Sequence, residues 1–123
     1  MKLPKVKTEI QLRYSDLDVL GHISNSVYNQ YFEIGRLDWF EALNEEQPVT
    51  VVANSNVDFI KEISFKDKVH VITSCIKKGT KSMTLSQDVY SNDELVTKST
   101  VVMVGFDQQT RKSCVLLDGW EAS

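Results

Sequence analysis

The segment Asn25–Leu43, NSVYNQYFEIGRLDWFEAL, decides the fold class of this chain. Its large apolar side chains recur at helical spacing and share one face of a helix. The residues on this face are Tyr28, Tyr31, Phe32, Gly35, Trp39, Ala42 and Leu43. Gly35 costs roughly 1 kcal/mol relative to alanine in a helix, so we expect the backbone to pack closely on a sheet there. Ile34, Leu37 and Phe40 lie off this face, which predicts that a wrapped sheet or a partner subunit covers a second side.

Strand-like segments flank the predicted helix on both sides. Before it, Thr8–Tyr14 alternates between apolar and polar residues, as a half-buried strand does. After Pro48 the β-rich segments are Val49–Phe59, Lys68–Lys77, Ser82–Tyr90, Leu95–Phe106 and Ser113–Leu117. Short turns such as Ser91–Glu94 join the later segments, which predicts antiparallel neighbours. One strand, one long helix and then a run of strands predict an α+β fold with the helix on one face of the sheet.

Length and composition limit the possible classes of protein. The chain has 123 residues, 41% hydrophobic and 25% charged, which predicts one globular domain over residues 1–123. A net charge of −3 does not favour nucleic acid or an anionic membrane as a partner. Apolar runs such as Val101–Val104 are too short to cross a bilayer, and no apolar stretch follows Met1–Lys5, so we expect no signal peptide. Cys75 and Cys114 lack metal-ligand spacing, which predicts reduced thiols in a cytoplasmic protein.

The connection between the first strand and the helix, Arg13–Asn25, has the sequence RYSDLDVLGHISN and is rich in reactive side chains. The first N–H groups of a helix lack intrahelical partners and carry the positive end of its dipole, so they can polarise a carbonyl oxygen. Asp18 is suited to act as a nucleophile or a general base. His22 can hydrogen-bond a substrate or orient water, and Gly21 permits a sharp turn.

A capped turn is the commoner explanation of such a cluster when spacing alone is considered. Asp, Ser and Asn side chains accept hydrogen bonds from the unpaired N–H groups of turns and helix starts. We assign that structural role to Asp16, which is expected to accept bonds from nearby backbone N–H groups, and to Ser24, which is expected to be the N-cap.

The motif D-x-D-x-x-G-H, an aromatic helix start and YFExxRxxxF together resemble the hotdog-fold thioesterases of the 4-hydroxybenzoyl-CoA thioesterase-like family. The matching residues are Asp16, Asp18, Gly21, His22, Asn25, Tyr28, Tyr31, Phe32, Glu33, Arg36 and Phe40. The resemblance continues through the later strands, with Asp67 opening one of them and a D-x-x-T-x-K turn at Asp107–Lys112. It covers essentially the whole chain.

The resemblance implies a curved antiparallel sheet wrapped around one long helix, in homodimers that often pair into homotetramers with active sites at the dimer interface. It implies hydrolysis of an acyl-CoA without a cofactor or metal. Asp18 would be the catalytic carboxylate, and the backbone N–H of Asn25 would polarise the thioester carbonyl. His22 and Gly21 would line the site, with Tyr28 beside the pocket. Relatives often have Asn where this chain has Ser24.

Two other functions remain open on the sequence. A hotdog hydratase or dehydratase would use Asp18 and His22 for acid–base chemistry on an enoyl thioester. A non-catalytic acyl-thioester binding protein would fit the departure at Ser24. In either case we expect pocket depth to depend on the helix, on the strand around Val51–Asn56 and on the partner subunit.

Several other polar residues are weaker candidates for the site. Glu33 lies away from the main helical face, and Arg36 is interpreted as an ion-pair or interface residue. His70 is expected at the surface. Lysines flank the turn near residue 79 and are interpreted as a solvated edge, with contact to the CoA phosphates as the alternative; they are Lys77, Lys78 and Lys81.

Overall fold

The computed structural model describes residues 2–43 and 49–123. The strands are β1 (Lys5–Ile10), β2 (Thr50–Phe59), β3 (Val69–Lys78), β4 (Ser82–Ser91), β5 (Glu94–Asp107) and β6 (Lys112–Ser113). The helix is α1 (Tyr28–Ala42), preceded by the 3-10 helices η1 (Tyr14–Asp16) and η2 (Asn25–Val27). Pro48, after which the strand-rich part was predicted to begin, lies outside the described residues.

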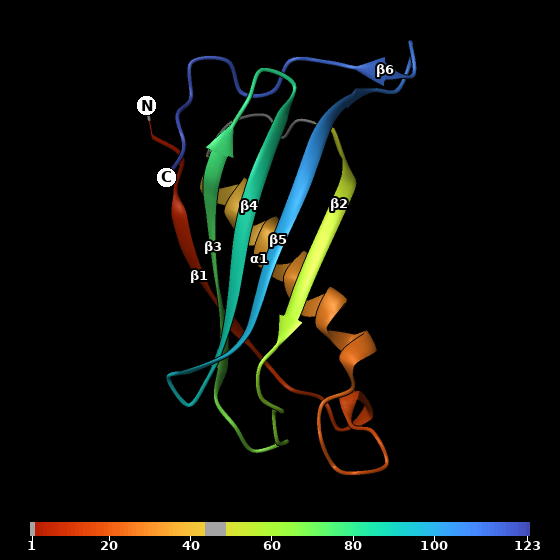
Figure 1. Cartoon of the computed structure of the whole chain (residues 1–123), viewed down its shortest axis with the longest axis vertical. Helices are drawn as coiled ribbons and strands as arrows, with labels where there is room; N and C mark the ends of the chain where they lie inside the picture. The colour runs from red at the N-terminus through yellow and green to blue at the C-terminus, as the bar shows by residue number, and fades with distance from the viewer. Residues whose placement is uncertain (1, 44–48) are drawn as a thin grey trace.

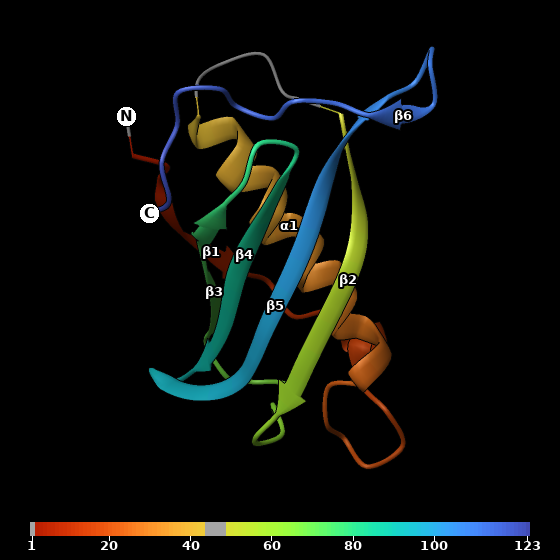
Figure 2. The same ribbon diagram turned by 45° about the horizontal axis from the view of Figure 1, so that its top comes forward.

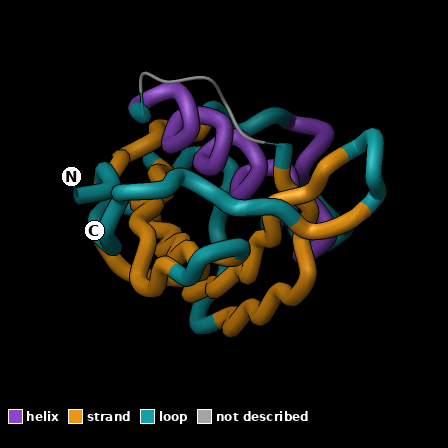
Figure 3. Tube along the Cα trace, turned by 90° about the horizontal axis from the view of Figure 1, so that it is seen from above, coloured by secondary structure: helices purple, strands orange, loops and turns teal. Residues whose placement is uncertain are grey.

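The strands form one antiparallel sheet in the order β1-β3-β4-β5-β2, and β6 pairs with β5. Figures 1 and 2 show α1 crossing behind the strands. The view from above in Figure 3 shows the sheet curling around the helix. This arrangement confirms the predicted α+β class and the hotdog fold. No helix among the described residues is long and apolar enough to span a membrane.

The inward face of α1 is close to the predicted one. Tyr28, Tyr31, Phe32, Gly35, Trp39 and Leu43 are all buried. The prediction was wrong for Ala42, which is exposed at the last residue of the helix. Phe40, predicted off the main face, is buried in the same core cluster as Trp39 and Leu43, whereas Ile34 and Leu37 stay 44% and 62% exposed.

Gly35 explains how closely the helix approaches the sheet. A Cβ atom at this position would lie 3.0 Å from Gln87 Nε2 and 3.0 Å from Thr73 Oγ1. Gln87 is fully buried, and its Nε2 donates to the backbone oxygen of Phe32 at 2.8 Å and to Thr73 Oγ1 at 3.1 Å. The close packing expected at Gly35 is confirmed, and it fixes the height of α1 above β3 and β4.

Two predicted strand boundaries were wrong. β1 runs from Lys5 to Ile10, so it begins and ends earlier than the predicted Thr8–Tyr14. It ends early because Arg13 and Tyr14 belong to the turn at η1, where Tyr14 is 79% exposed. The segment Ser113–Leu117 is mostly not a strand. After β6 the chain crosses the end of the sheet, and Leu116 is buried in the core with its N–H bonded to the Thr80 oxygen.

Candidate active site

A cavity of about 270 Å³ lies where the end of β2 meets the start of the helical segment. Figures 1 and 2 both show the loop before η2 beside the end of β2, at one end of the molecule. The cavity is lined by Asp18, His22, Ile23, Asn25, Tyr28, Phe59, Ile60, Lys61 and Glu62. The fold thus brings Asp18, His22, Asn25 and Tyr28 together around one space. Gly21 is not among the lining residues.

The carboxylate of Asp18 is fixed by the loop that carries it. Its Oδ1 accepts hydrogen bonds from the backbone N–H groups of Leu20, at 2.8 Å, and His22, at 3.2 Å. The backbone N–H of Asp18 in turn donates to the His22 oxygen at 2.8 Å. Both side-chain bonds use Oδ1, and the described residues donate no hydrogen bond to Oδ2. Asp18 is exposed and lines the cavity.

Asp16 has the opposite environment and is 1% exposed. Its carboxylate accepts bonds from the Tyr31 hydroxyl at 2.7 Å, the Arg13 backbone N–H at 3.1 Å and Arg13 Nε at 3.1 Å. Burial raises the pKa of Asp16, but these hydrogen bonds and the Arg13 charge outweigh it, so the pKa lies below its usual value. The structural role predicted for Asp16 is confirmed.

The start of the helical segment leaves backbone donors beside the cavity. Ser24 occupies the N-cap position of η2, but its side chain makes no capping bond; its Oγ pairs with Ser26 Oγ at 3.0 Å. The predicted capping by the Ser24 side chain was therefore wrong. The backbone N–H of Ser24 donates to the backbone oxygen of Asp16, and the backbone N–H of Val27 donates to the backbone oxygen of Ser24. No described residue accepts a hydrogen bond from the Asn25 amide, which lies at the positive end of the helical segment.

The turn between Asp18 and His22 depends on glycine. Gly21 has φ +79°, and a Cβ atom there would have no heavy atom within 4 Å. Its role is thus conformational, since non-glycine residues rarely adopt positive φ. His22 is half-buried and lines the cavity, and its backbone forms an isolated bridge to Ser64.

Tyr28 forms the inner wall of the cavity. Its side chain is buried, and its ring lies 5.1 Å from the Phe59 ring in an edge-to-face contact at 80°. Burial raises the pKa of Tyr28, the neighbouring Thr97 hydroxyl opposes this, and the Glu62 charge raises it further. The position expected for Tyr28 beside the pocket agrees with this geometry.

The sequence-based reasoning missed the residues that follow β2, together with the last residue of that strand, namely Phe59, Ile60, Lys61 and Glu62. Pocket depth was predicted to depend on the helix, the strand around Val51–Asn56 and the partner subunit. Tyr28 of the helix lines the cavity, whereas none of Val51–Asn56 does. The available signal was the length of the strand itself. β2 pairs with β5 along its whole length, and the ring of its last residue, Phe59, lies 5.1 Å from the ring of Tyr28 at the start of α1.

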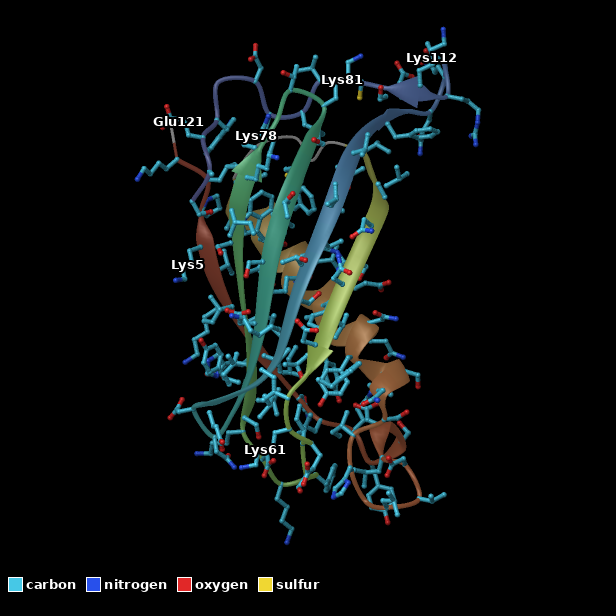
Figure 4. All side chains as sticks on the ribbon, in the orientation of Figure 1. Lys5, Lys61, Lys78, Lys81, Lys112 and Glu121 are labelled. Carbon is cyan, nitrogen blue, oxygen red and sulfur yellow. The ribbon has the colours of Figure 1, made fainter. Side chains whose placement is uncertain are left out.

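The weaker candidates lie outside the cavity. Glu33 is exposed, and Arg36 donates to Gln87 Oε1 at 3.1 Å. Figure 4 shows Lys61 at the cavity end of the molecule and Lys78 and Lys81 at the opposite end. His70 lines a larger, mixed-charge cavity of about 560 Å³ beside β1 and β3, where its ring stacks on Tyr90 with centroids 5.1 Å apart. That cavity contains none of the predicted site residues.

Both cysteines are free thiols, with Cys75 buried and Cys114 partly exposed. Among the described residues, no group of three or more His, Cys, Asp or Glu side chains is placed to hold a metal ion.

Two proteins of known sequence are similar to this chain. YsmA of Bacillus subtilis (strain 168), described as uncharacterized, is 28% identical over 81 residues, which cover 63% of this chain and 55% of YsmA. The long-chain acyl-CoA thioesterase FadM of Escherichia coli (strain K12) is 27% identical over 119 residues, covering 90% of each chain.

Thioesterases of known structure superpose closely on this chain. A predicted thioesterase from Bacillus stearothermophilus matches with a TM-score of 0.84 and 26% identity, covering 94% of this chain and 90% of its own. A thioesterase from Thermus thermophilus, complexed with coenzyme A and Zn, matches with a TM-score of 0.81 and 28% identity, covering 91% of this chain and 90% of its own. The model of the thioesterase-like superfamily matches residues 12–119. The chain belongs to this superfamily and is a hotdog-fold thioester hydrolase.

Proposed function

We propose that this protein hydrolyses acyl-CoA thioesters. In this proposal Asp18 is the catalytic carboxylate, and the backbone N–H of Asn25 donates a hydrogen bond to the thioester carbonyl. One observation carries the proposal: a single cavity is lined by both residues, with the carboxylate held by two backbone N–H groups. The named activity of FadM and the coenzyme A bound to the Thermus thioesterase support an acyl-CoA as the substrate.

The carbonyl oxygen is expected to accept a hydrogen bond from the Asn25 amide. This donor opposes the negative charge that develops on the oxygen when the carbonyl is attacked. His22 lies on the same cavity wall and can hydrogen-bond the substrate or a water molecule. Among the described residues, no group competes with the substrate for the backbone N–H of Asn25.

Asp18 can act by two routes, as a nucleophile or as a general base. In the first, Oδ2 attacks the carbonyl carbon, the carbon–sulfur bond breaks, CoA leaves as a thiolate, and water then hydrolyses the mixed anhydride. In the second, Asp18 takes a proton from water as the water oxygen attacks the carbonyl carbon. The carbon–sulfur bond then breaks, CoA leaves as a thiolate, and the proton held by Asp18 returns to the thiolate or to solvent. Both routes yield a free acid and CoA, and neither needs a cofactor.

The decisive experiment compares Asp18→Asn with Glu62→Gln, which changes a second carboxylate in the same cavity. Asparagine keeps an Oδ1 acceptor for the amides of Leu20 and His22, so the loop should hold its shape. We expect Asp18→Asn to lower kcat by about 10²–10⁴-fold, and Glu62→Gln to change it by only a few fold. Near-wild-type release of free thiol by folded Asp18→Asn would defeat the assignment. Addition of water to an enoyl-CoA without thiol release would instead favour a hydratase.

We further propose that the protein is a homodimer in which β2 of one copy meets β2 of the other. β2 ends the sheet, and nearly all its residues are exposed in the single chain. Exposed apolar side chains continue from this strand to the neighbouring helix; they are Val51, Val52, Phe59, Ile34 and Leu37. An unpaired apolar edge strand is a template for pairing with a second chain, and an isologous contact closes after two copies.

The remaining expectations also stand as proposals. Residues 1–123 would form one domain, and two dimers would associate into a tetramer. The protein would reside in the cytoplasm, which the free thiols of Cys75 and Cys114 support.

A further inference from the structure

The connection from β2 to β3 forms one wall of the candidate active site. Its first residues include Lys61 and Glu62, which line the cavity together with Asp18 and Asn25. The same two residues also line a second cavity, of about 160 Å³. Figures 1 and 2 show this connection at the same end of the molecule as the loop before η2. Because Lys61 and Glu62 line two cavities, close packing alone does not hold this wall in place.

The connection pairs with the loop that carries Asp18 and His22. The backbone N–H of Ile23 donates to the backbone oxygen of Ile63 at 2.9 Å, and His22 and Ser64 form an isolated antiparallel bridge. Ile63 is fully buried, so it anchors the connection beside the loop. The position of His22 at the cavity therefore depends on the position of Ser64.

A four-residue turn, Ser64–Asp67, holds Ser64 in two ways. The backbone N–H of Asp67 donates to the backbone oxygen of Ser64 at 3.0 Å, and the backbone N–H of Ser64 donates to Asp67 Oδ2 at 2.9 Å. Within the turn, the ring of Phe65 makes an edge-to-face contact with the ring of Tyr14, with centroids 5.6 Å apart. The turn thus contacts the segment Arg13–Asn25 at a second point.

The carboxylate of Asp67 also ties this turn to the hairpin between β4 and β5. Ser91 Oγ donates to Oδ2 at 2.8 Å, and Asn92 Nδ2 donates to Oδ1 at 3.2 Å. Burial raises the pKa of Asp67, but these bonds, the Ser64 N–H and the Lys61 charge outweigh it, so the pKa lies below its usual value. Asp67 is therefore ionised at neutral pH, and hydrogen bonds to an ionised acceptor are roughly twice as strong as neutral ones.

We propose that Asp67 is a positioning residue of the active site. It does not line the active-site cavity. By holding Ser64 against the hairpin, it keeps His22 at the cavity and fixes the wall formed by Lys61 and Glu62. The expected effect on turnover rests on the proposed thioesterase function, whereas the effect on the position of His22 does not.

The test compares Asp67→Ala and Asp67→Asn with the matched control Asp38→Ala. Asp38 is also a half-buried carboxylate that joins two elements, since its Oδ2 accepts a hydrogen bond from Thr8 Oγ1 at 2.8 Å between α1 and β1. It does not line the active-site cavity. Ser64→Ala is a second control, because it keeps the backbone N–H that bonds to Asp67.

Turnover is measured at a temperature at which every variant is folded by circular dichroism. A displacement of about 1 Å in an active site can cost roughly 100-fold in rate. We expect Asp67→Ala to lower kcat by about 10–100-fold, with a smaller change in KM. Asp67→Asn should lose less, because its amide oxygen can still accept from Ser64 and Ser91. Both controls should keep wild-type kcat.

The side-chain NMR signals of His22 give a readout that does not require catalysis. The chain has two histidines, so His22→Gln identifies these signals. We expect them to shift in Asp67→Ala and to stay unchanged in Asp38→Ala.

Unchanged His22 signals, together with a kcat no lower than in Asp38→Ala, would overturn the inference. If Asp67→Ala does not fold, Asp67→Asn is compared with the controls by the same two measurements. If the wild-type protein releases no thiol from any acyl-CoA, the proposed function fails, and the His22 signals alone then decide whether Asp67 positions the loop.

Discussion

The hydroxyl of Tyr31 donates a hydrogen bond of 2.7 Å to Asp16 Oδ2, and this bond commits the first carboxylate of the D-x-D motif to the scaffold. Asp16 also accepts from Arg13, whereas Asp18, two residues later, is exposed and keeps Oδ2 without a donor among the described residues. Two carboxylates in the same short motif thus have different environments, because one bonds to Tyr31 on the helix and the other lines the cavity.

Replacing Asp16 by Asn should destabilise the protein without touching the cavity. The substitution removes charge-assisted bonds to Tyr31 and Arg13 in a buried place, which costs about 2–3 kcal/mol in the free energy of unfolding at neutral pH. Urea unfolding measures this change. Asp18→Asn is the control and should stay within about 0.5 kcal/mol of wild type. Equal stability of the two variants would contradict the assignment of Asp16 to the scaffold.

The same carboxylate predicts a specific acid response. The pKa of Asp16 is lowered in the folded state, so ionised Asp16 stabilises the fold above its unfolded pKa of about 3.9. This stabilisation is lost as the pH falls through the lower, folded-state pKa. We expect the difference between wild type and Asp16→Asn in the free energy of unfolding to shrink below about pH 4. If this difference stays constant as the pH falls from neutral through this range, ionised Asp16 does not stabilise the fold.

Gly21→Ala should reduce activity more than it reduces stability. The positive φ of Gly21 strains any residue with a Cβ atom by roughly 1–2 kcal/mol, although no neighbouring atom would clash. Relief of that strain would move the turn that orients Asp18 and His22. Gly119→Ala is a matched control, with φ +83° and no atom within 4 Å of a Cβ. Similar losses of kcat in both variants would argue against a role of the Gly21 turn in orienting the carboxylate.

Gly35→Ala should destabilise the fold even though alanine is the better helix former. The new Cβ would meet Gln87 and Thr73 at 3.0 Å, and both neighbours are buried and hydrogen-bonded. Overpacking of this kind costs about 1–3 kcal/mol, against about 1 kcal/mol gained in helix propensity. Asn29→Ala, on the exposed side of the same helix, should not destabilise the protein. Thermal unfolding compares the two, and a higher Tm for Gly35→Ala would contradict the close packing.

A charge on the edge strand should separate the proposed dimer. Val52→Lys places an ammonium group on β2, at a side chain that is 49% exposed in the single chain. Desolvating that charge in the contact would be unfavourable, so sedimentation velocity should show a shift towards monomer. Val115→Lys, at a comparably exposed site of 53% outside β2, serves as the control. Unchanged association of the Val52 variant would place the interface elsewhere.

The spacing of apolar residues and the positions of turn residues predicted most of the fold. Apolar spacing located α1, because a helix with one buried face requires that periodicity. The hairpin at Ser91–Glu94 was likewise predicted, and Asn92 and Asp93 adopt φ +51° and +65° there. The first strand was misplaced, since its alternation continued into residues that the Arg13–Asp16 contacts draw into a turn.

The sequence by itself determined the identity of the reactive loop, the helix behind it and the family to which both belong, because these depend on residues close together in the chain. Only the tertiary structure decided that Asp16 is buried and bonded to Tyr31, that the Ser24 side chain pairs with Ser26 rather than capping the helical segment, and that the Phe59 ring contacts the Tyr28 ring. Each of these depends on where a side chain lies relative to a segment distant in sequence or on a competition between local partners. The physical reason is that burial and ring contacts are set by the pairing of β2 with β5 and the packing of α1 on the sheet, which no local pattern encodes.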